Sequence, residues 1–318
     1  MDNKEAIEKA IDSTILANGG KLNPEQSKKF IDFMEETATL LKSGEIQFKR
    51  METPEAKLDL IGISKRIIRA ANEGVAPTKT AVIDTAQRSL TVKEVILPIE
   101  LTYTFLKENI EKEDAEDHII KMFATQFTND LEDLAINGDT QAQNTDNTQP
   151  HYYDVSEGEI AFLRIFDGWL QLILADPNKH IVDTSGKEWK DVFKAALASL
   201  PRKYKARKTG LRFYVAPNVE EEYRYLLAAR QTELGDKLLT ENKTTTFMGI
   251  PIVPIPSMPD DHILLTMPKN LAFGILKNEI SIEKDKDIMR RVKQYVITAD
   301  VGVQIVTADA AVLAYPVS

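Results

Sequence analysis

Cysteine is absent from the 318 residues of the chain, which excludes a disulfide framework, a thiolate nucleophile and any zinc or iron–sulfur centre held by cysteine. Long apolar runs are absent too, because no stretch reaches the roughly 18 apolar residues of a membrane-spanning helix. The first residues, Met1-Asp2-Asn3-Lys4-Glu5, lack the basic start and apolar run of a signal peptide. We therefore expect a protein that is made and used in a cytoplasm, with no membrane partner.

The chain also lacks an excess of positive charge: its 40 Lys and Arg residues face 49 Asp and Glu residues, a net charge of −9. An acidic protein repels the phosphate backbone, so a general nucleic-acid binder is disfavoured. The apolar fraction of 43% and the charged fraction of 28% are ordinary for a soluble globular protein. This composition excludes a collagen, a mucin or a mainly disordered chain, and the length suggests about two domains.

Signals of catalysis are missing as well. No G-x-S-x-G motif is present, so there is no nucleophile elbow. Ser185-Gly186-Lys187 is similar to the end of a phosphate-binding loop, but Ile181 stands where that motif needs glycine. The four histidines, His118, His151, His180 and His262, are scattered without metal-ligand spacing. We expect no catalytic residue, no cofactor and no bound metal.

Two charged clusters each keep more than one interpretation. The first is a run of carboxylates, read either as a divalent-cation site or as an acidic helix start that offsets the helix dipole: Glu108, Glu111, Glu113, Asp114, Glu116 and Asp117. The second is a basic run, read as a solvated turn, a contact with an acidic protein or a nucleic-acid patch: Arg202, Lys203, Lys205, Arg207, Lys208 and Arg212.

Helical spacing dominates the first part of the chain and returns after residue 113. Apolar residues at steps of three or four predict helices over residues 2–17 and from Asn23-Pro24 to Ser43-Gly44. The apolar face of the second must pack against another element, which we expect on a neighbouring subunit: Phe30, Phe33, Met34, Thr37, Leu40 and Leu41. The strongest helix runs from Asp114 to Asn137, with Phe123 and Phe127 predicted to be core residues.

Between these helices lies a predicted long β-hairpin. Leu58–Ile68 and Ser89–Leu101 are rich in β-prone residues. The segment between them, Ala70–Arg88, has no aromatic residue and few large apolar ones. Two strands without a covering layer are marginally stable, so we expect a neighbouring copy to hold the tip.

The second half of the chain alternates helices and strands. After a polar, exposed loop at residues 139–159, we expect helices at Phe162–Leu174, Glu188–Leu200 and Pro217–Arg230. Prolines 251, 254, 256 and 259 predict an extended edge rather than a helix or a central strand. Strands are expected at Leu211–Val215, Ile263–Thr266, Leu271–Leu276, Tyr295–Thr307 and Ala311–Tyr315.

Four segments stand out together by their order and spacing. They are Lys57–Ile68 followed by Glu73-Gly74; Leu131–Asp139 at the end of the long helix; Leu211–Pro217 running into Glu220–Tyr223; and Met248–Pro254 followed by Asn270–Gly274. In this order they resemble the major capsid proteins of tailed bacteriophages, which have the Hong Kong 97-like fold. These are similar to the family's extended loop, spine helix, apical strand and helix, and late G-I-P strand. Together they cover nearly the whole chain.

The resemblance implies an α+β fold with five parts. It assigns residues 1–50 to an N-terminal arm, 51–101 to the extended β-hairpin loop and 102–177 to a peripheral domain with the spine helix. Residues 178–296 form the apical domain, and 297–318 are strands that return to the peripheral domain. The implied function is that of a structural, non-enzymatic subunit. It assembles in the host cytoplasm into the icosahedral shell of a virion enclosing double-stranded DNA.

The resemblance also implies partners. They are copies of the same chain in hexameric and pentameric capsomers, a separate scaffolding protein, a portal, a decoration protein, and packaged DNA without sequence-specific contacts. Some family members join a lysine of the extended loop to an asparagine of a neighbour. Lys79 lies near the predicted hairpin tip, but no motif identifies a matching asparagine or the assisting glutamate.

Two alternatives remain open from the sequence. A bacterial nanocompartment shell protein of the same fold encloses a cargo enzyme instead of DNA. A different class of protein, an α+β enzyme or binding protein, would carry a site that the sequence does not reveal. The first, like the phage capsid, predicts particles of megadalton size, whereas the second predicts a monomer or small oligomer.

Overall fold

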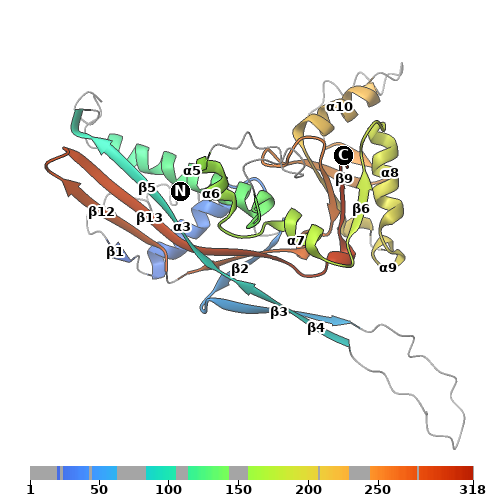
Figure 1. The fold of residues 1–318 in the computed structure, drawn as a ribbon, viewed down its shortest axis with the longest axis horizontal. Coiled ribbons are helices and arrows are strands. Elements are labelled where there is room, and N and C mark those ends of the chain that lie inside the picture. Colours follow the sequence, from blue (N-terminus) through green and yellow to red (C-terminus); the bar gives the residue numbers. More distant parts are fainter. Residues whose placement is uncertain are drawn as a thin grey trace, which may run out of the picture.

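The described residues form two six-stranded sheets and a two-stranded ribbon that projects from them (Figure 1). The computed structural model describes residues 20–21, 24–42, 45–62, 84–104, 114–142, 157–206, 208–228, 244–277 and 279–317. The predicted helix at residues 2–17 lies outside the described residues, as does most of the predicted loop at 139–159. Where the start of that loop is described, Asp139 and Ala142 are buried and Gln141 is exposed, so the expected exposure is met only in part.

The first sheet is organised around one long strand, β13. Both β11 and β12 pair with it antiparallel along one edge, and β5 pairs with it antiparallel along the other. β2 then pairs in parallel with β11, and β1 pairs with β12. The strands are β1 (Gly20–Lys21), β2 (Gln47–Met51), β5 (Lys93–Thr102), β11 (Leu271–Leu276), β12 (Ser281–Asp287) and β13 (Val292–Ile305).

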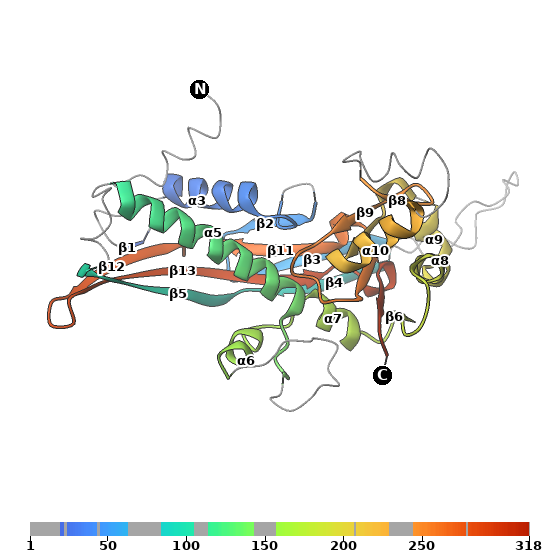
Figure 2. The ribbon, with the colours of Figure 1, turned by 90° about the horizontal axis from the view of Figure 1, so that it is seen from above.

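Two helices, α3 (Pro24–Thr37) and α5 (Asp114–Asn137), lie on one side of this sheet (Figure 2). The predicted bounds of the spine helix are confirmed, with Phe127 buried and Phe123 partly buried against the core. The expectation that the apolar face of α3 needs a neighbouring subunit is wrong. Phe30 and Met34 are buried within the same chain, and the ring of Phe30 lies 6.3 Å from that of Phe127.

The end of α3 is fixed by a buried carboxylate. Helix α3 stops at Thr37 rather than at residue 42. The backbone N–H groups of Thr39 and Leu40 then donate to Glu132 of α5, at 3.0 and 2.5 Å. Burial raises the pKa of Glu132, although these two N–H donors oppose the shift. The bonds turn the chain after α3, which directs Leu40 and Leu41 into the core.

The second sheet has the strand order β6-β14-β10-β7-β9-β8. Helices α8 (Trp189–Ser199) and α10 (Pro217–Ala228) pack against it. Its strands are β6 (His180–Asp183), β7 (Arg212–Val215), β8 (Thr246–Phe247), β9 (Ile250–Pro254), β10 (Ile263–Thr266) and β14 (Val312–Tyr315). The proline-rich strand β9 is second from the edge, because the short β8 pairs outside it. The prediction of an extended segment is confirmed, but the prediction that it forms the edge is wrong, because β9 pairs with β7 on one side and with β8 on the other.

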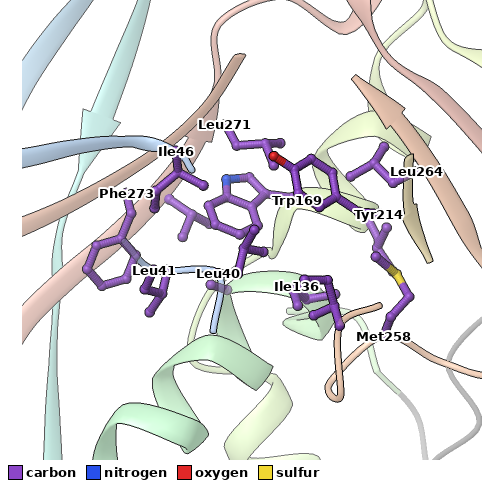
Figure 3. Close-up of a cluster of buried hydrophobic side chains, with 14 of the residues drawn as sticks. Leu40, Leu41, Ile46, Ile136, Trp169, Tyr214, Met258, Leu264, Leu271 and Phe273 are labelled. Atoms are coloured by element: carbon purple, nitrogen blue, oxygen red, sulfur yellow. The ribbon is translucent and has the colours of Figure 1, made fainter. Parts of the chain in front are cut away.

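A continuous apolar core joins the two sheets around Trp169 (Figure 3). This tryptophan is 1% exposed, and its indole N–H donates to the carbonyl of Ala272 at 3.3 Å. Leu41 and Ile46 approach it from the first sheet's side, and Tyr214 from the second sheet (Figure 3). We call the buried side chains labelled in Figure 3 the junction core. It fixes the two sheets relative to each other, because moving either would open a cavity beside a large buried ring.

The helix predicted over Phe162–Leu174 is divided in two, as α6 (Glu157–Leu163) and α7 (Trp169–Ala175). The break is needed because Gly168 lies against the end of α5. A Cβ on Gly168 would stand 2.6 Å from the carbonyl oxygen of Ile136, and one on Gly138 would stand 2.2 Å from that of Phe166. The glycines thus let the two backbones touch, which places Trp169 in the junction core.

Candidate functional site

The predicted hairpin is present as an antiparallel ribbon of β3 (Glu55–Gly62) and β4 (Asp84–Thr91). Its described part ends at the pair Gly62 and Asp84. The ribbon runs away from the body of the molecule (Figure 1). One part of the prediction is wrong: from Lys93 the chain leaves the hairpin and becomes β5 of the first sheet. The segment Ser89–Leu101 therefore belongs partly to β4 of the ribbon and partly to β5 of the first sheet.

The ribbon is packed only at its base, among the residues whose side chains are described. Leu58 and Leu90 are buried there in a small separate cluster with Met51, Ala272 and Leu276. Farther along, Asp59 and Gln87 are exposed. Among the described side chains, the burial that orders the ribbon within one subunit is therefore at its base. Fixing any further residue costs about 1–2 kcal/mol of backbone entropy.

Two glycines let the ribbon cross the first sheet closely. A Cβ on Gly302 of β13 would lie 2.0 Å from the carbonyl oxygen of Thr91. A Cβ on Gly274 of β11 would meet the side chains of Met51 and Leu90, at 2.6 and 2.8 Å. At Gly302 only glycine leaves room, because the neighbour is backbone, whereas at Gly274 the flexible ends of Met51 and Leu90 would have to shift. The crossing sets where the ribbon departs from the body.

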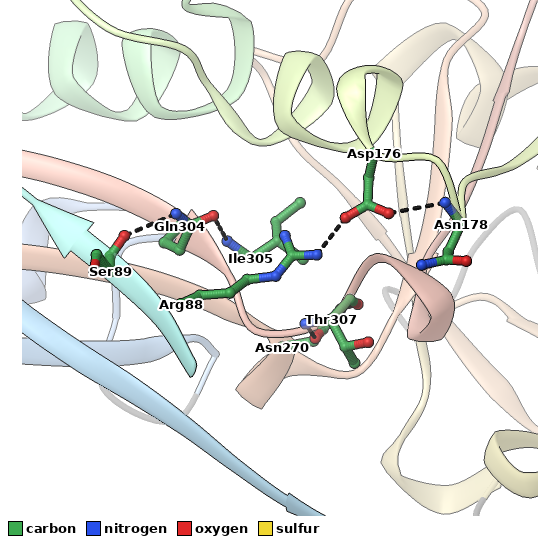
Figure 4. A network of polar contacts seen from close by, with 8 residues as sticks. All are labelled: Arg88, Ser89, Asp176, Asn178, Asn270, Gln304, Ile305 and Thr307. Atoms are coloured by element: carbon green, nitrogen blue, oxygen red, sulfur yellow. Dashed lines mark hydrogen bonds and ion pairs between the residues drawn. The ribbon is translucent and has the colours of Figure 1, made fainter. Parts of the chain in front are cut away.

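Polar contacts hold the base of the ribbon at a fixed place (Figure 4). The guanidinium of Arg88 on β4 pairs with the carboxylate of Asp176, just after α7. The side-chain amide of Gln304 donates to the carbonyl of Ser89 at 2.9 Å. Burial opposes ionisation of Asp176, but the N–H of Asn178 and the guanidinium of Arg88 outweigh it, so its pKa lies below the ordinary value. Nothing in the sequence pairs Arg88 with a carboxylate 88 positions later.

The other candidate residues are spread over the molecule. Lys79, His151 and Arg207 lie outside the described residues, as do Glu108, Glu111 and Glu113; the side chains of Asp114, Glu116, Asp117 and His118 are likewise not described. Buried His262 contacts the carbonyl of Asp260 at 2.7 Å, and His180 lies 3.3 Å from Asp309. No group of three or more potential ligands that could hold a metal occurs among the described residues.

The two remaining motifs have structural explanations. Ser185-Gly186-Lys187 forms the turn after β6, where the N–H of Ser185 donates to Asp183. The basic run includes the four-residue helix α9 (Arg202–Lys205). Within the basic run, Lys203 pairs with Asp309 at 2.5 Å, and Arg212 pairs with Glu45. In the described part of the chain, no helix is long and apolar enough to cross a membrane.

Comparison with known proteins decides between the open alternatives. The family model described as "Phage major capsid protein, P2 family" matches residues 3–301. The chain belongs to this family of phage major capsid proteins. A curated relative, the putative prophage capsid protein YqbE of Bacillus subtilis (strain 168), is 35% identical over 315 residues, which cover 94% of each chain.

Solved structures show the same fold. A chain of the procapsid of satellite phage P4, which includes a size determination (Sid) protein, is similar with a TM-score of 0.72 at 13% identity, and each chain is covered completely. The capsid of a native GTA particle is similar with a TM-score of 0.57 at 14% identity, over 89% of this chain and 91% of the other. The expected Hong Kong 97-like capsid fold is therefore confirmed. The protein is a structural capsid subunit that assembles into oligomers, and neither the nanocompartment nor the enzyme alternative is favoured.

Proposed function

We propose that this capsid subunit closes into an icosahedral phage head, built from hexameric and pentameric capsomers, that encloses double-stranded DNA. The observation that carries the proposal is the ribbon β3–β4, which leaves the body while its described buried side chains stay at its base. A projecting element of this kind gains its remaining contacts from another subunit. Within a shell the same contact is repeated many times, so a weak pairing decides whether the shell closes.

The proposal includes the division of the chain into parts. Residues 1–50 act as the N-terminal arm, 51–101 as the extended loop, 102–177 and 297–318 as the peripheral domain, and 178–296 as the apical domain. Strand pairing crosses this division in several places. The first sheet contains β1, β2 and β5 from the arm and loop ranges, and β11 and β12 from the apical range. β14 lies in the second sheet beside β10.

The finer assignments of partner and place belong to the same proposal. Assembly takes place in the bacterial cytoplasm, with a separate scaffolding protein, a portal and a decoration protein as partners. The subunit carries no catalytic activity. The packaged DNA is enclosed without sequence-specific contacts, as the family resemblance implies. The net charge of −9 disfavours a general affinity for phosphate.

The test is to shorten the ribbon beyond its last described pair. A variant in which a short Gly-Ser turn replaces residues 63–83 keeps Gly62 and Asp84. We expect a folded, soluble subunit with an almost unchanged circular dichroism spectrum and thermal midpoint, and no closed particles by electron microscopy and light scattering. Closed particles from this variant would overturn the role given to the ribbon.

Two further arms complete the experiment. The variant Lys79→Ala keeps the length of the hairpin and removes the lysine amine named above for crosslinking. If this variant forms normal particles that separate into monomers in denaturing gels, shell closure does not need that amine.

The contents of wild-type particles, purified from cells that carry the complete phage genes, distinguish the proposed head from a nanocompartment. DNA inside supports the proposal, and a cargo protein inside overturns it.

A further inference from the structure

The turn between β12 and β13 carries two exposed apolar side chains at one end of the molecule (Figure 1). Ile288 is 78% exposed and Met289 is 93% exposed. Tight turns usually carry glycine, asparagine or aspartate, yet this one places a branched and a long apolar residue side by side in water. We call residues 286–291 the tip.

The tip is held in one conformation by its neighbours. The carboxylate of Asp287 accepts the N–H groups of Met289 and Arg290, both at 2.9 Å. The guanidinium of Arg290 reaches back to both oxygens of Glu100 on β5, at 2.9 and 3.1 Å. A fixed tip loses little conformational entropy when it binds, so it is preorganised for a partner.

The tip region is basic, whereas the whole chain is acidic. Residues 284–293 hold five cationic side chains and two carboxylates, which gives a net charge of +3 against −9 for the chain. Lys286 and Arg291 are exposed. The partner that complements the tip therefore offers negative charge beside an apolar surface.

Such a surface lies on the open face of the first sheet, opposite α3 and α5. Among the described residues, a hollow of about 340 Å³ is lined there by four carboxylates and two hydroxyl side chains: Glu94, Glu279, Ser281, Glu283, Thr298 and Asp300. An apolar strip runs beside it. Ile96, which is 61% exposed, pairs with Thr298, and exposed Pro98 pairs with Val296.

We propose that the tip of one subunit docks on this open face of a neighbouring subunit, with Ile288 and Met289 on the apolar strip and the cations of the tip toward the carboxylates of the hollow. The inference rests on the proposed function, since it requires assembling copies. This contact between the tip and the open face is separate from any contact that the ribbon makes.

The tip cannot fill the hollow of its own chain. Strands β12 and β13 carry both features, with Glu283 and Asp300 along the strands and Ile288 in the turn that joins them. An extended strand keeps residues about 3.3 Å apart for each step along it, so tip and hollow stay separated. The contact therefore joins two copies through different surfaces. Such heterologous contacts continue from copy to copy and form a ring where the rotation between copies closes.

Cysteine trapping tests the contact directly, because the wild-type chain contains no cysteine. In a variant with Ile96→Cys and Met289→Cys, we expect oxidation of assembled particles to give covalent oligomers on a non-reducing gel. Each single variant should stay monomeric. As a matched control, Met289→Cys is combined with Met248→Cys, which places the second thiol on another exposed methionine in the turn after β8, and should stay monomeric.

Two outcomes would overturn the inference. Dimers from Met289→Cys alone would show that tips meet tips, and an uncrosslinked double variant in intact particles would show that the tip does not reach the strip. Because both readings are made on closed particles, they leave the proposed head function standing. Failure of the wild-type chain to form any particle would instead count against that function.

A charge exchange provides the second measurement. Lys286→Glu with Arg291→Glu should abolish closed particles while leaving the thermal midpoint of the subunit unchanged. Adding Glu94→Lys and Glu283→Lys to the same chain should restore them. The matched control is Arg202→Glu with Lys190→Glu, which makes the same change in net charge at exposed sites on the helices beside the second sheet. Particles that form normally from the tip variant, or that are not restored by the exchange, would contradict the docking.

Discussion

The junction core and the ribbon are made by the same chain in opposite ways. Around Trp169, side chains from both sheets bury one another completely, so the contact is complete within one subunit. In the ribbon, the described buried residues Leu58 and Leu90 lie at the base, and exposed Asp59 and Gln87 follow. The difference teaches that stability and assembly are assigned to separate regions, and that substitutions in each region should affect different measurements.

The largest effect is expected in the core that continues from the junction along α5. Phe127→Ala removes a ring that is 3% exposed, which costs about 3–5 kcal/mol of unfolding free energy. Soluble yield and thermal midpoint should fall before assembly is tested. Met122→Ala, on the same helix but 61% exposed, should change the unfolding free energy little. Equal melting of the two variants would mean that α5 does not bury this face.

An intermediate effect is expected where the ribbon crosses the first sheet. Gly302→Ala would place a Cβ 2.0 Å from the backbone carbonyl of Thr91, and a backbone atom cannot move aside cheaply. Such overpacking costs about 1–3 kcal/mol and should lower the denaturation midpoint. Gly210→Ala is the matched control, because nothing lies within 4 Å of its added Cβ. Indistinguishable midpoints would refute the close crossing.

The smallest effect is expected at the polar base of the ribbon. Arg88→Ala removes the partner of Asp176 and should cost about 1 kcal/mol at neutral pH. The pKa of Asp176 is lowered from 3.8 in the folded protein, so the stabilisation is present above that value and is lost as pH falls through the folded pKa. Denaturation of both proteins from neutral to acidic pH checks this. A difference between them that stays constant down to the acid range would show that the ion pair is not its source.

Local signals were sufficient for the elements whose ends are encoded in neighbouring residues. Helix α5 begins at an acidic turn and ends at Asn137-Gly138, so its bounds could be predicted. Strands β10 and β11 are continuous apolar runs and were found with their bounds. In such segments, periodicity and capping agree with the final packing.

The missed features depend on partners distant in sequence. Strand β12, with the sequence SIEKDKD, has no apolar alternation and is a strand because β13 pairs with it. The break before α7 follows from the contact of Gly168 with the end of α5, and the inward packing of α3 follows from Glu132 and Phe127. For the ribbon, the strands were predictable, but the contact of Arg88 with Asp176 requires the fold.

The central claim is that the ribbon is completed by a neighbouring subunit, while the junction core is complete in one chain. Hydrogen exchange, read by mass spectrometry on free subunits and on closed particles, tests it most directly. Peptides from the hairpin beyond the pair Gly62 and Asp84 should exchange fast in free subunits and slowly in particles. Peptides that cover α7 and β7 should be protected in both. Equal protection of the hairpin peptides in free subunits and in particles would contradict the account.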